Sequence, residues 1–290
     1  MEPRERDFPL RDYAELRERA EAWRAGRLPE PPAPRLASTV MLVRDAEAAE
    51  GGTSGVEVFM LRRVSTMAFA PSVMVFPGGG VDPRDSHDVP WSGPSPTAWA
   101  ARLGVRDDDQ ARMLVVAAVR EVYEECGVLL AASGDDGAAL HRELVDTSVE
   151  PWPAIRAGLE ARELSLAEVL REQQLRLRTD LLRLEAHWVT PVIETRQYDT
   201  RIFAALMPAG RHADGETSEA EVAEWVRPQA VIDGYAAGQA MVLPPTLTAL
   251  EHLARHTSAV EFLECEPDVR RIRPEPVLLD DGQVVLRAVH

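Results

Sequence analysis

Residues 117–128, AAVREVYEECGV, place one arginine and three glutamates in an otherwise apolar run. A helix over this stretch brings Glu121, Glu124 and Glu125 to one face, because residues three and four apart are neighbours on a helix. Unpaired carboxylates at that spacing repel one another, so the fold that contains them must supply positive charge. A divalent cation would do so, since Mg²⁺ and Mn²⁺ prefer oxygen ligands such as carboxylates.

The helix that carries these glutamates is predicted to begin near Asp107, whose carboxylate can cap the first amides. Gln110 follows at the spacing of a capping box, and Gly127 can adopt the left-handed conformation that ends a helix. Three acids alone could also form the solvated face of an amphipathic helix. A strand ending in Phe-Pro-Gly-Gly-Gly at 76–80 favours a site instead, because glycines let the backbone approach a ligand closely.

These two stretches together resemble the Nudix box. REVYEECGV at 120–128 fits every position of R-E-U-x-E-E-x-G-U, where U is a bulky aliphatic residue. FPGGGVDPRD is similar to the first half, G-x5-E, with Gly79 as the glycine and Asp85 in place of the glutamate. The usual seven residues before the arginine become 34 here, at 86–119. Together, in this order, the two halves are a specific signature.

A long insertion inside the box is a feature of the Nudix branch that contains the peroxisomal acyl-coenzyme A diphosphatases and their bacterial relatives. Three other stretches look like that branch, and the resemblance covers residues 36–255. The stretches are FMLRRVSTMAFAPSVMVFPGGGVD, HWVTPVIETRQYDTRIFAALMP and PPTLTALEHL.

The resemblance implies an α/β (α+β) protein with the Nudix fold, a mixed β-sheet sandwiched between helices and carrying helical insertions. We expect three parts: an N-terminal helix and proline-rich connector at 1–35, the Nudix domain at 36–260, and a C-terminal extension at 261–290 that forms a β-hairpin. The insertion 86–119 and a helical insertion at about 135–186 are expected to cover the active-site mouth.

Local patterns predict the elements of this fold. Apolar runs predict strands, and three- and four-residue periodicity predicts helices. The acid-rich stretch 210–225 is predicted to be a loop. The predicted strands are 38–45, 56–63, 72–80, 187–193 and 200–208, and the predicted helices include 9–26 and 245–256.

The resemblance also implies a metal site that holds Mg²⁺ or Mn²⁺. Glu121 and Glu125 would be direct ligands, Glu124 would hold a second ion or its water, and the backbone carbonyl of Gly79 would be a further ligand. In family members, water attacks phosphorus while the cations neutralise charge on the diphosphate.

The expected catalytic residues are those of the box itself. Arg120 would orient Glu121, and Asp85 would support the site through Arg120, although its side chain is one methylene shorter than the usual glutamate. With them, Glu124 completes the catalytic set. The general base is either a box glutamate or a carboxylate of the acid-rich stretch, where the candidates are Glu216, Glu219 and Glu221. A solvated acidic loop is the alternative interpretation of those three.

A diphosphate substrate needs local positive charge in so acidic a protein. Four arginines near presumed site strands are candidates for binding it, and structural salt bridges are the alternative role for each. They are Arg62, Arg63, Arg196 and Arg201.

The leading functional hypothesis is a metal-dependent Nudix hydrolase that cleaves the diphosphate of coenzyme A or acyl-coenzyme A. The products would be adenosine 3′,5′-bisphosphate and phosphopantetheine or its acyl form. One alternative is the same chemistry on another nucleoside diphosphate, such as ADP-ribose, a dinucleotide or a nucleotide sugar. A second is a Nudix-fold module that binds its ligand without catalysis.

Composition excludes several other classes. A net charge of −16 and a pI of about 4.9 argue against nucleic-acid partners, which require a basic face. All 32 basic residues are arginine, which excludes Schiff-base and Walker-lysine chemistry. Cys126 and Cys265 lack zinc-site spacing, so no zinc site is expected. We expect a cytoplasmic protein with no membrane segment, a small-molecule nucleoside diphosphate as its partner, and a homodimer as a possible state.

Overall fold

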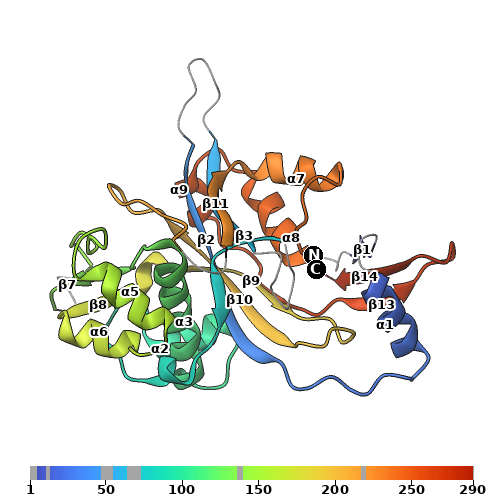
Figure 1. The fold of residues 1–290 in the computed structure, drawn as a ribbon, viewed down its shortest axis with the longest axis horizontal. Helices are drawn as coiled ribbons and strands as arrows, with labels where there is room; N and C mark the ends of the chain where they lie inside the picture. Colours follow the sequence, from blue (N-terminus) through green and yellow to red (C-terminus); the bar gives the residue numbers. More distant parts are fainter. Residues whose placement is uncertain are drawn as a thin grey trace, which may run out of the picture.

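A mixed β-sheet forms the centre of the molecule (Figure 1). The computed structural model describes residues 5–10, 14–46, 55–63, 73–135, 140–216 and 220–289. The strand order is β11-β3-β2-β10-β9-β12, with β4 pairing with β3 and β5 with β2. These strands are β2 (Arg35–Asp45), β3 (Val56–Arg63), β4 (Met74–Val75), β5 (Gly78–Gly80), β9 (Arg183–Val189), β10 (Tyr198–Leu206), β11 (Ala220–Val226) and β12 (Arg271–Ile272).

The middle strand β2 is buried on both faces, and its side chains alternate between them. Val40 and Leu42 join one apolar cluster, whereas Met41 and Val43 join the other. β2 runs parallel to β10 and antiparallel to β3. Burial on both faces explains why this strand reads as a continuous apolar run and not as an alternating pattern.

One face of the sheet is covered by helices from the middle of the chain. Their buried residues form a single apolar cluster with Val40 and Leu42, on the left in Figure 1. A small sheet of order β6-β8-β7 lies with them. These elements are α2 (Pro96–Leu103), α3 (Asp108–Cys126), α5 (Trp152–Glu160), α6 (Leu166–Glu172), β6 (Trp91–Ser92), β7 (Ala131–Ser133) and β8 (Leu175–Arg178). Two short 3₁₀ helices are η1 (Pro83–Ser86) and η2 (Thr179–Leu181).

The other face is covered by helices from the C-terminal third. α7 (Pro228–Ala236), α8 (Pro244–Leu253) and α9 (Ala259–Glu264) contribute to the second apolar cluster together with Met41 and Val43. The sheet therefore lies between two helical layers. This confirms the expected fold class, a mixed sheet sandwiched between helices.

The helix that carries the glutamates is held at both ends and in the middle. The Asp107 carboxylate accepts a hydrogen bond from the Gln110 amide at 2.7 Å, and Gly127 ends the helix with φ 70°. The Ser38 hydroxyl donates to the Leu114 carbonyl at 2.6 Å, which ties α3 to β2. Because α3 begins at Asp108, the second half of the 86–119 insertion lengthens this helix.

Strands near the two ends of the chain pair with each other in a small antiparallel sheet. β1 (Glu5–Pro9) pairs antiparallel with β14 (Val284–Val289), which also pairs with β13 (Glu275–Leu278), as Figure 1 shows at the right. The N-terminal helix is α1 (Ala14–Arg24), and β12 joins the central sheet through β9. The expected boundary at residue 260 falls inside α9, because Ala259 and Phe262 both pack in the second apolar cluster.

The loop prediction for 210–225 is wrong in its second half, where β11 pairs with β3. Trp225 packs edge-to-face on Phe59 at 5.3 Å, and the Arg44 guanidinium lies 4.2 Å from the centre of its ring. Glu221 and Glu224 on the same strand are exposed, and Trp225 is partly buried. The charge of the two glutamates obscured this edge strand.

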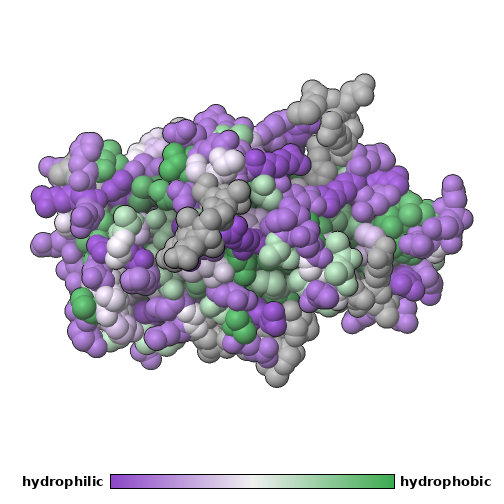
Figure 2. All heavy atoms as spheres, turned by 90° about the horizontal axis from the view of Figure 1, so that it is seen from above, coloured by the Kyte–Doolittle hydropathy of each residue, from purple (hydrophilic) through white to green (hydrophobic). Residues whose placement is uncertain are grey.

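Hydrophilic side chains cover most of the face seen in Figure 2, and hydrophobic residues appear there as small separate patches. Within the described part of the chain, no helix has the length and apolar character needed to cross a membrane.

Candidate active site

Arg120 is the centre of the site. It is buried near the C-terminal end of α3 and makes a bidentate pair with Asp85, with Nε–Oδ1 at 2.9 Å and Nη2–Oδ2 at 3.0 Å. Asp85 is 2% exposed and lies in η1, where its Oδ2 also accepts from the Asp82 amide. The fold thus brings Asp85 back beside Arg120 across the insertion, and the carboxylate reaches despite its shorter side chain.

Two of the three box glutamates contact the same nitrogen of Arg120. Nη1 donates to Glu121 at 2.8 Å and to Glu124 at 3.1 Å. Nη2 also donates to the Gly80 carbonyl at 3.0 Å, which links the helix to β5. One guanidinium therefore joins α3, η1 and β5 through charge-assisted hydrogen bonds.

The three glycines of β5 each serve the site differently. The Gly78 amide donates to Glu125 at 2.7 Å. A Cβ atom at Gly79 would lie 2.6–2.8 Å from the carboxylate atoms of Glu121, so only glycine fits there without displacing that carboxylate. β5 thus packs its backbone directly against the acidic face of the helix, the close approach that its glycines predict.

The charges of this group do not balance. Arg120 pairs with Asp85, Glu121 and Glu124, so one positive charge faces three negative charges and two negative charges remain. All four side chains are largely buried, which makes the excess costly. The donor set, carboxylates beside glycine backbone, fits a hard divalent cation that would neutralise the excess.

The pKa values of these buried groups are also shifted from their ordinary values. Burial raises the pKa of Glu121 to about 7, and the charge of Glu124 acts in the same direction against the effect of Arg120. Burial likewise raises the pKa of Glu124. Burial alone would lower the pKa of Arg120, but its hydrogen bond to Asp85 and the nearby glutamates raise that pKa above its ordinary value. Such perturbed groups gather at functional sites.

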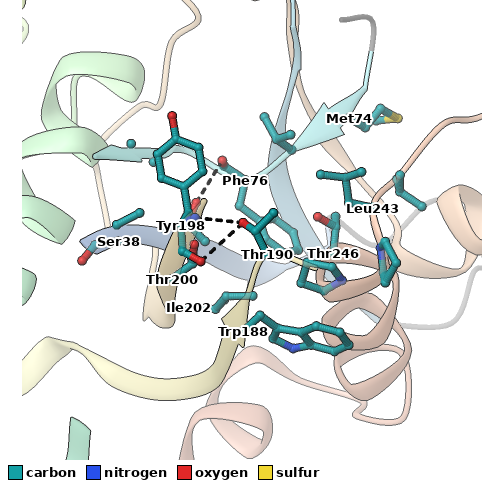
Figure 3. Close-up of a pocket in the computed structure, with 18 of the residues that line it drawn as sticks. Ser38, Met74, Phe76, Trp188, Thr190, Tyr198, Thr200, Ile202, Leu243 and Thr246 are labelled. Carbon is teal, nitrogen blue, oxygen red and sulfur yellow. Dashed lines mark hydrogen bonds between the residues drawn. The ribbon is translucent and has the colours of Figure 1, made fainter. Parts of the chain in front are cut away.

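A cleft of about 1690 Å³ opens beside these residues and is lined by Arg120 and all three box glutamates. Most ligand pockets enclose about 300–1,000 Å³, so this cleft can hold a large ligand. Figure 3 shows part of its wall, where apolar and hydroxyl-bearing side chains from segments distant in sequence surround one space. The labelled residues there include Met74, Phe76, Trp188, Ile202, Leu243 and Thr246.

The four candidate diphosphate-binding arginines divide into two groups. Arg62 and Arg196 are exposed and line the cleft. Arg63 ends β3, and its side chain lies outside the described part of the structure. Arg201 is 3% exposed and donates to Asp199 and to the Leu103 carbonyl, so the fold does not bring it to the cleft.

The three candidate distal bases differ in whether they line the cleft. Glu221 lies on β11 and lines the cleft. The Glu216 amide donates to Asp214 at 3.0 Å, and Glu216 does not line the cleft. Glu219 lies outside the described residues.

Sequence reasoning missed Arg84. It lines the cleft, pairs with Asp82 at 2.8 Å and donates to the Leu164 carbonyl at 2.8 Å. The hydrogen bond from Arg84 lowers the pKa of Asp82 to about 2. The Asp82-Pro83 pair was the available signal. An aspartate before a proline is a common helix start, and it would have placed Arg84 in the first turn of a short helix beside the box.

Comparisons with known proteins agree with this geometry. No family model matches the sequence. The acyl-coenzyme A diphosphatase NUDT19 of Xenopus laevis is 23% identical over 235 residues, which cover 70% of this chain and 61% of that protein. A Caenorhabditis elegans protein named as nudix hydrolase 7 is 28% identical over 198 residues, 68% of this chain and 56% of the relative. The chain thus spans less than two thirds of both relatives.

A solved structure matches over a larger share. The crystal structure of a NUDIX hydrolase from Alicyclobacillus acidocaldarius is 26% identical, has a TM-score of 0.65, and covers 81% of this chain and 97% of its own.

Fold, box geometry and relatives point to one class: the chain has the Nudix fold and resembles the Nudix hydrolases, proteins that act on acid anhydrides and generally need divalent metal ions. Within that class it resembles the acyl-coenzyme A diphosphatase branch.

The pair between Asp85 and Arg120 should stabilise the fold. We expect Asp85→Asn to lower the free energy of unfolding by about 2–3 kcal/mol, because it removes one partner of a buried ion pair and sets an amide N–H against guanidinium donors. Denaturant unfolding measures this loss. Asp88→Asn is the control, since Asp88 is 92% exposed and its contact with Arg112 is 3.9 Å. Equal stability of the two variants would contradict the structural role of Asp85.

The close approach at Gly79 gives a second test. Gly79→Ala should displace the Glu121 carboxylate and weaken divalent-ion binding by about tenfold or more, whereas Gly80→Ala should not, because a Cβ at Gly80 meets nothing within 4 Å. Titration calorimetry with Mn²⁺ measures both affinities. If the two alanine variants bind the ion equally well, the fit of β5 to Glu121 does not matter for the metal.

Proposed function

We propose that this protein hydrolyses the diphosphate of coenzyme A or acyl-coenzyme A with Mg²⁺ or Mn²⁺. The observation that carries the proposal is the cleft, which combines the box carboxylates with an apolar wall that includes Trp188, Ile202 and Leu243. Coenzyme A compounds have that combined character, since a charged diphosphate is joined to a long, weakly polar thioester arm. The similarity to NUDT19 supports the same substrate class.

In this proposal the box holds the metal and the surrounding residues hold the substrate. Glu121, Glu124 and Glu125 would bind the ions together with the Gly79 carbonyl. A bound divalent ion supplies charge neutralisation at the diphosphate and activation of water for attack on phosphorus. Arg120 keeps the Glu121 and Glu124 carboxylates in place through its hydrogen bonds.

The substrate contacts are proposed from the cleft wall. Arg62 and Arg196 are positioned to bind phosphate groups, because both are exposed along the cleft. The apolar wall would pack against the pantetheine and acyl groups and exclude water from them. Arg63 stays a candidate, and a homodimer stays a possible state.

A substrate panel tests the proposal. Coenzyme A, acyl-coenzyme A, ADP-ribose, a dinucleotide and a nucleotide sugar are each incubated with Mg²⁺ or Mn²⁺, and products are separated by HPLC. We expect adenosine 3′,5′-bisphosphate and the matching phosphopantetheine from the first two. Turnover of another substrate alone would favour the other Nudix pyrophosphatases. Metal and ligand binding without any turnover would favour the binding module.

The same assay includes Glu125→Gln, which should lose activity and bind metal at least about tenfold more weakly. Glu163→Gln is the matched control, because Glu163 is exposed and does not line the cleft. A Glu125→Gln variant with full activity would contradict the role of the box.

The general base can be located by comparing two distal glutamates. If Glu221 takes the proton from water, Glu221→Gln should lower kcat by about 10²–10⁴-fold at saturating metal without changing metal affinity. Glu216→Gln should leave kcat unchanged, because that residue does not line the cleft. Full activity of Glu221→Gln would leave the box glutamates and Glu219 as the candidate bases.

A further inference from the structure

A group of three metal-ligating residues lies outside the box. His252 is in the last turn of α8, His256 follows the end of that helix, and Cys265 caps the end of α9. One possible ligand atom from each lies within 4.8 Å of the other two. All three side chains are partly exposed, so an ion can reach them. The spacing H-x₃-H-x₈-C gives no familiar motif, and the packing of α8 and α9 brings the residues together.

A carboxylate already orients one of these imidazoles. His252 Nδ1 lies 2.6 Å from Glu185 Oε1, and the Glu185 side chain on β9 is 4% exposed. This bond leaves Nε2 of His252 for a ligand. Histidines that bind metals almost always donate their other ring N–H to a carboxylate, a backbone carbonyl or water, which fixes the ring and its tautomer.

The shell around the cluster is also held in place. Arg183 donates to Glu185 and to the Cys265 carbonyl, which ties β9 to the end of α9. Its guanidinium lies 4.3 Å from the centre of the Phe262 ring. The Glu185 carboxylate is thereby held between a cation and an imidazole, and the backbone of Cys265 is fixed.

Aromatic packing is the competing explanation. The rings of His252, His256 and Phe262 contact one another edge-to-face, with centroids 5.3–5.5 Å apart. Packing accounts for the two rings, but it accounts neither for the thiol beside them nor for the buried carboxylate on His252. A tetrahedral zinc site with bond lengths of about 2.0–2.3 Å separates its ligands by about 3.3–3.8 Å. Small side-chain rotations close that difference.

We propose that His252, His256 and Cys265 form a second metal site, which binds a zinc-class cation through two imidazoles and a thiolate. Imidazole and thiolate ligands select a borderline-soft ion, in contrast to the carboxylates of the box, which suit Mg²⁺ or Mn²⁺. Water completes the coordination. A bound ion would join the end of α8 to the end of α9, and α8 contributes Thr246, Leu247 and Glu251 to the cleft wall.

Cobalt titration of the full-length protein tests this proposal. Co²⁺ substitutes for Zn²⁺, and a cysteine ligand gives a thiolate-to-cobalt charge-transfer band that a carboxylate site cannot produce. A large excess of Mg²⁺ occupies the box during the titration. We expect the band to saturate at one equivalent of Co²⁺ and to disappear on addition of Zn²⁺. The absence of this band in the wild type would overturn the proposal.

Variants assign the ligands. Cys265→Ser should abolish the band, and His256→Gln should lose or strongly weaken it. Glu185→Gln should lower the affinity by about 10–100-fold, because it removes the charge that orients His252. His141→Gln is the matched control, since His141 is exposed and distant in sequence, and it should titrate like the wild type.

Two measurements keep the outcome interpretable. Circular dichroism melts without added metal establish that each variant is folded before its titration is compared. Hydrolysis in Mg²⁺ alone should be retained by Cys265→Ser, which separates this proposal from the function of the box. A band that survives in folded Cys265→Ser would overturn the site, and the three residues would then be a packing cluster.

Discussion

The guanidinium of Arg120 is the contact on which the arrangement of the site depends. Its donors reach Asp85 in η1, Glu121 and Glu124 on its own helix, and the Gly80 carbonyl in β5. Asp85 and Arg120 are separated by 34 residues, and those residues form a strand, a helix and most of α3. This bidentate pair joins the two ends of the insertion. The pair also keeps β5 close enough for Gly79 to pack on Glu121.

The charges around Arg120 are unbalanced, because negative charges outnumber positive ones. A structural ion pair would match its charges, since a buried uncompensated carboxylate is costly. Here three carboxylates share one arginine, and burial, with a smaller contribution from neighbouring carboxylates, raises the pKa values of Glu121 and Glu124. A site that is stabilised by binding a cation has this property. Arg120 is not expected to bind substrate, because its guanidinium donors already form hydrogen bonds within the protein.

How much could be predicted from sequence depends on whether a feature is local. The glutamate face, the Asp107 cap and the Gly127 stop all lie within one helix, and their spacing alone predicted them. Arg201 could not be assigned, because its partner Leu103 lies 98 residues away and only the fold reveals it. β11 was missed because the exposed Glu221 and Glu224 mask a strand that packs through Trp225. The cysteine spacing gave no sign of a zinc site. His252, His256 and Cys265 come together only in the fold, where α8 and α9 pack on the sheet.

The metal site expected at the box and the proposed second site would differ in ligand chemistry as well as in place, so both could be filled at once. The box offers carboxylate oxygens beside glycine backbone, a donor set that suits strongly hydrated ions of the Mg²⁺ kind. The proposed second site offers imidazoles and a thiolate, which bind such ions poorly and zinc-class ions well. α8 contributes Glu251 to the cleft and His252, the next residue, to the second site. A zinc-class ion there would therefore stiffen one wall of the cleft without entering the chemistry at the box.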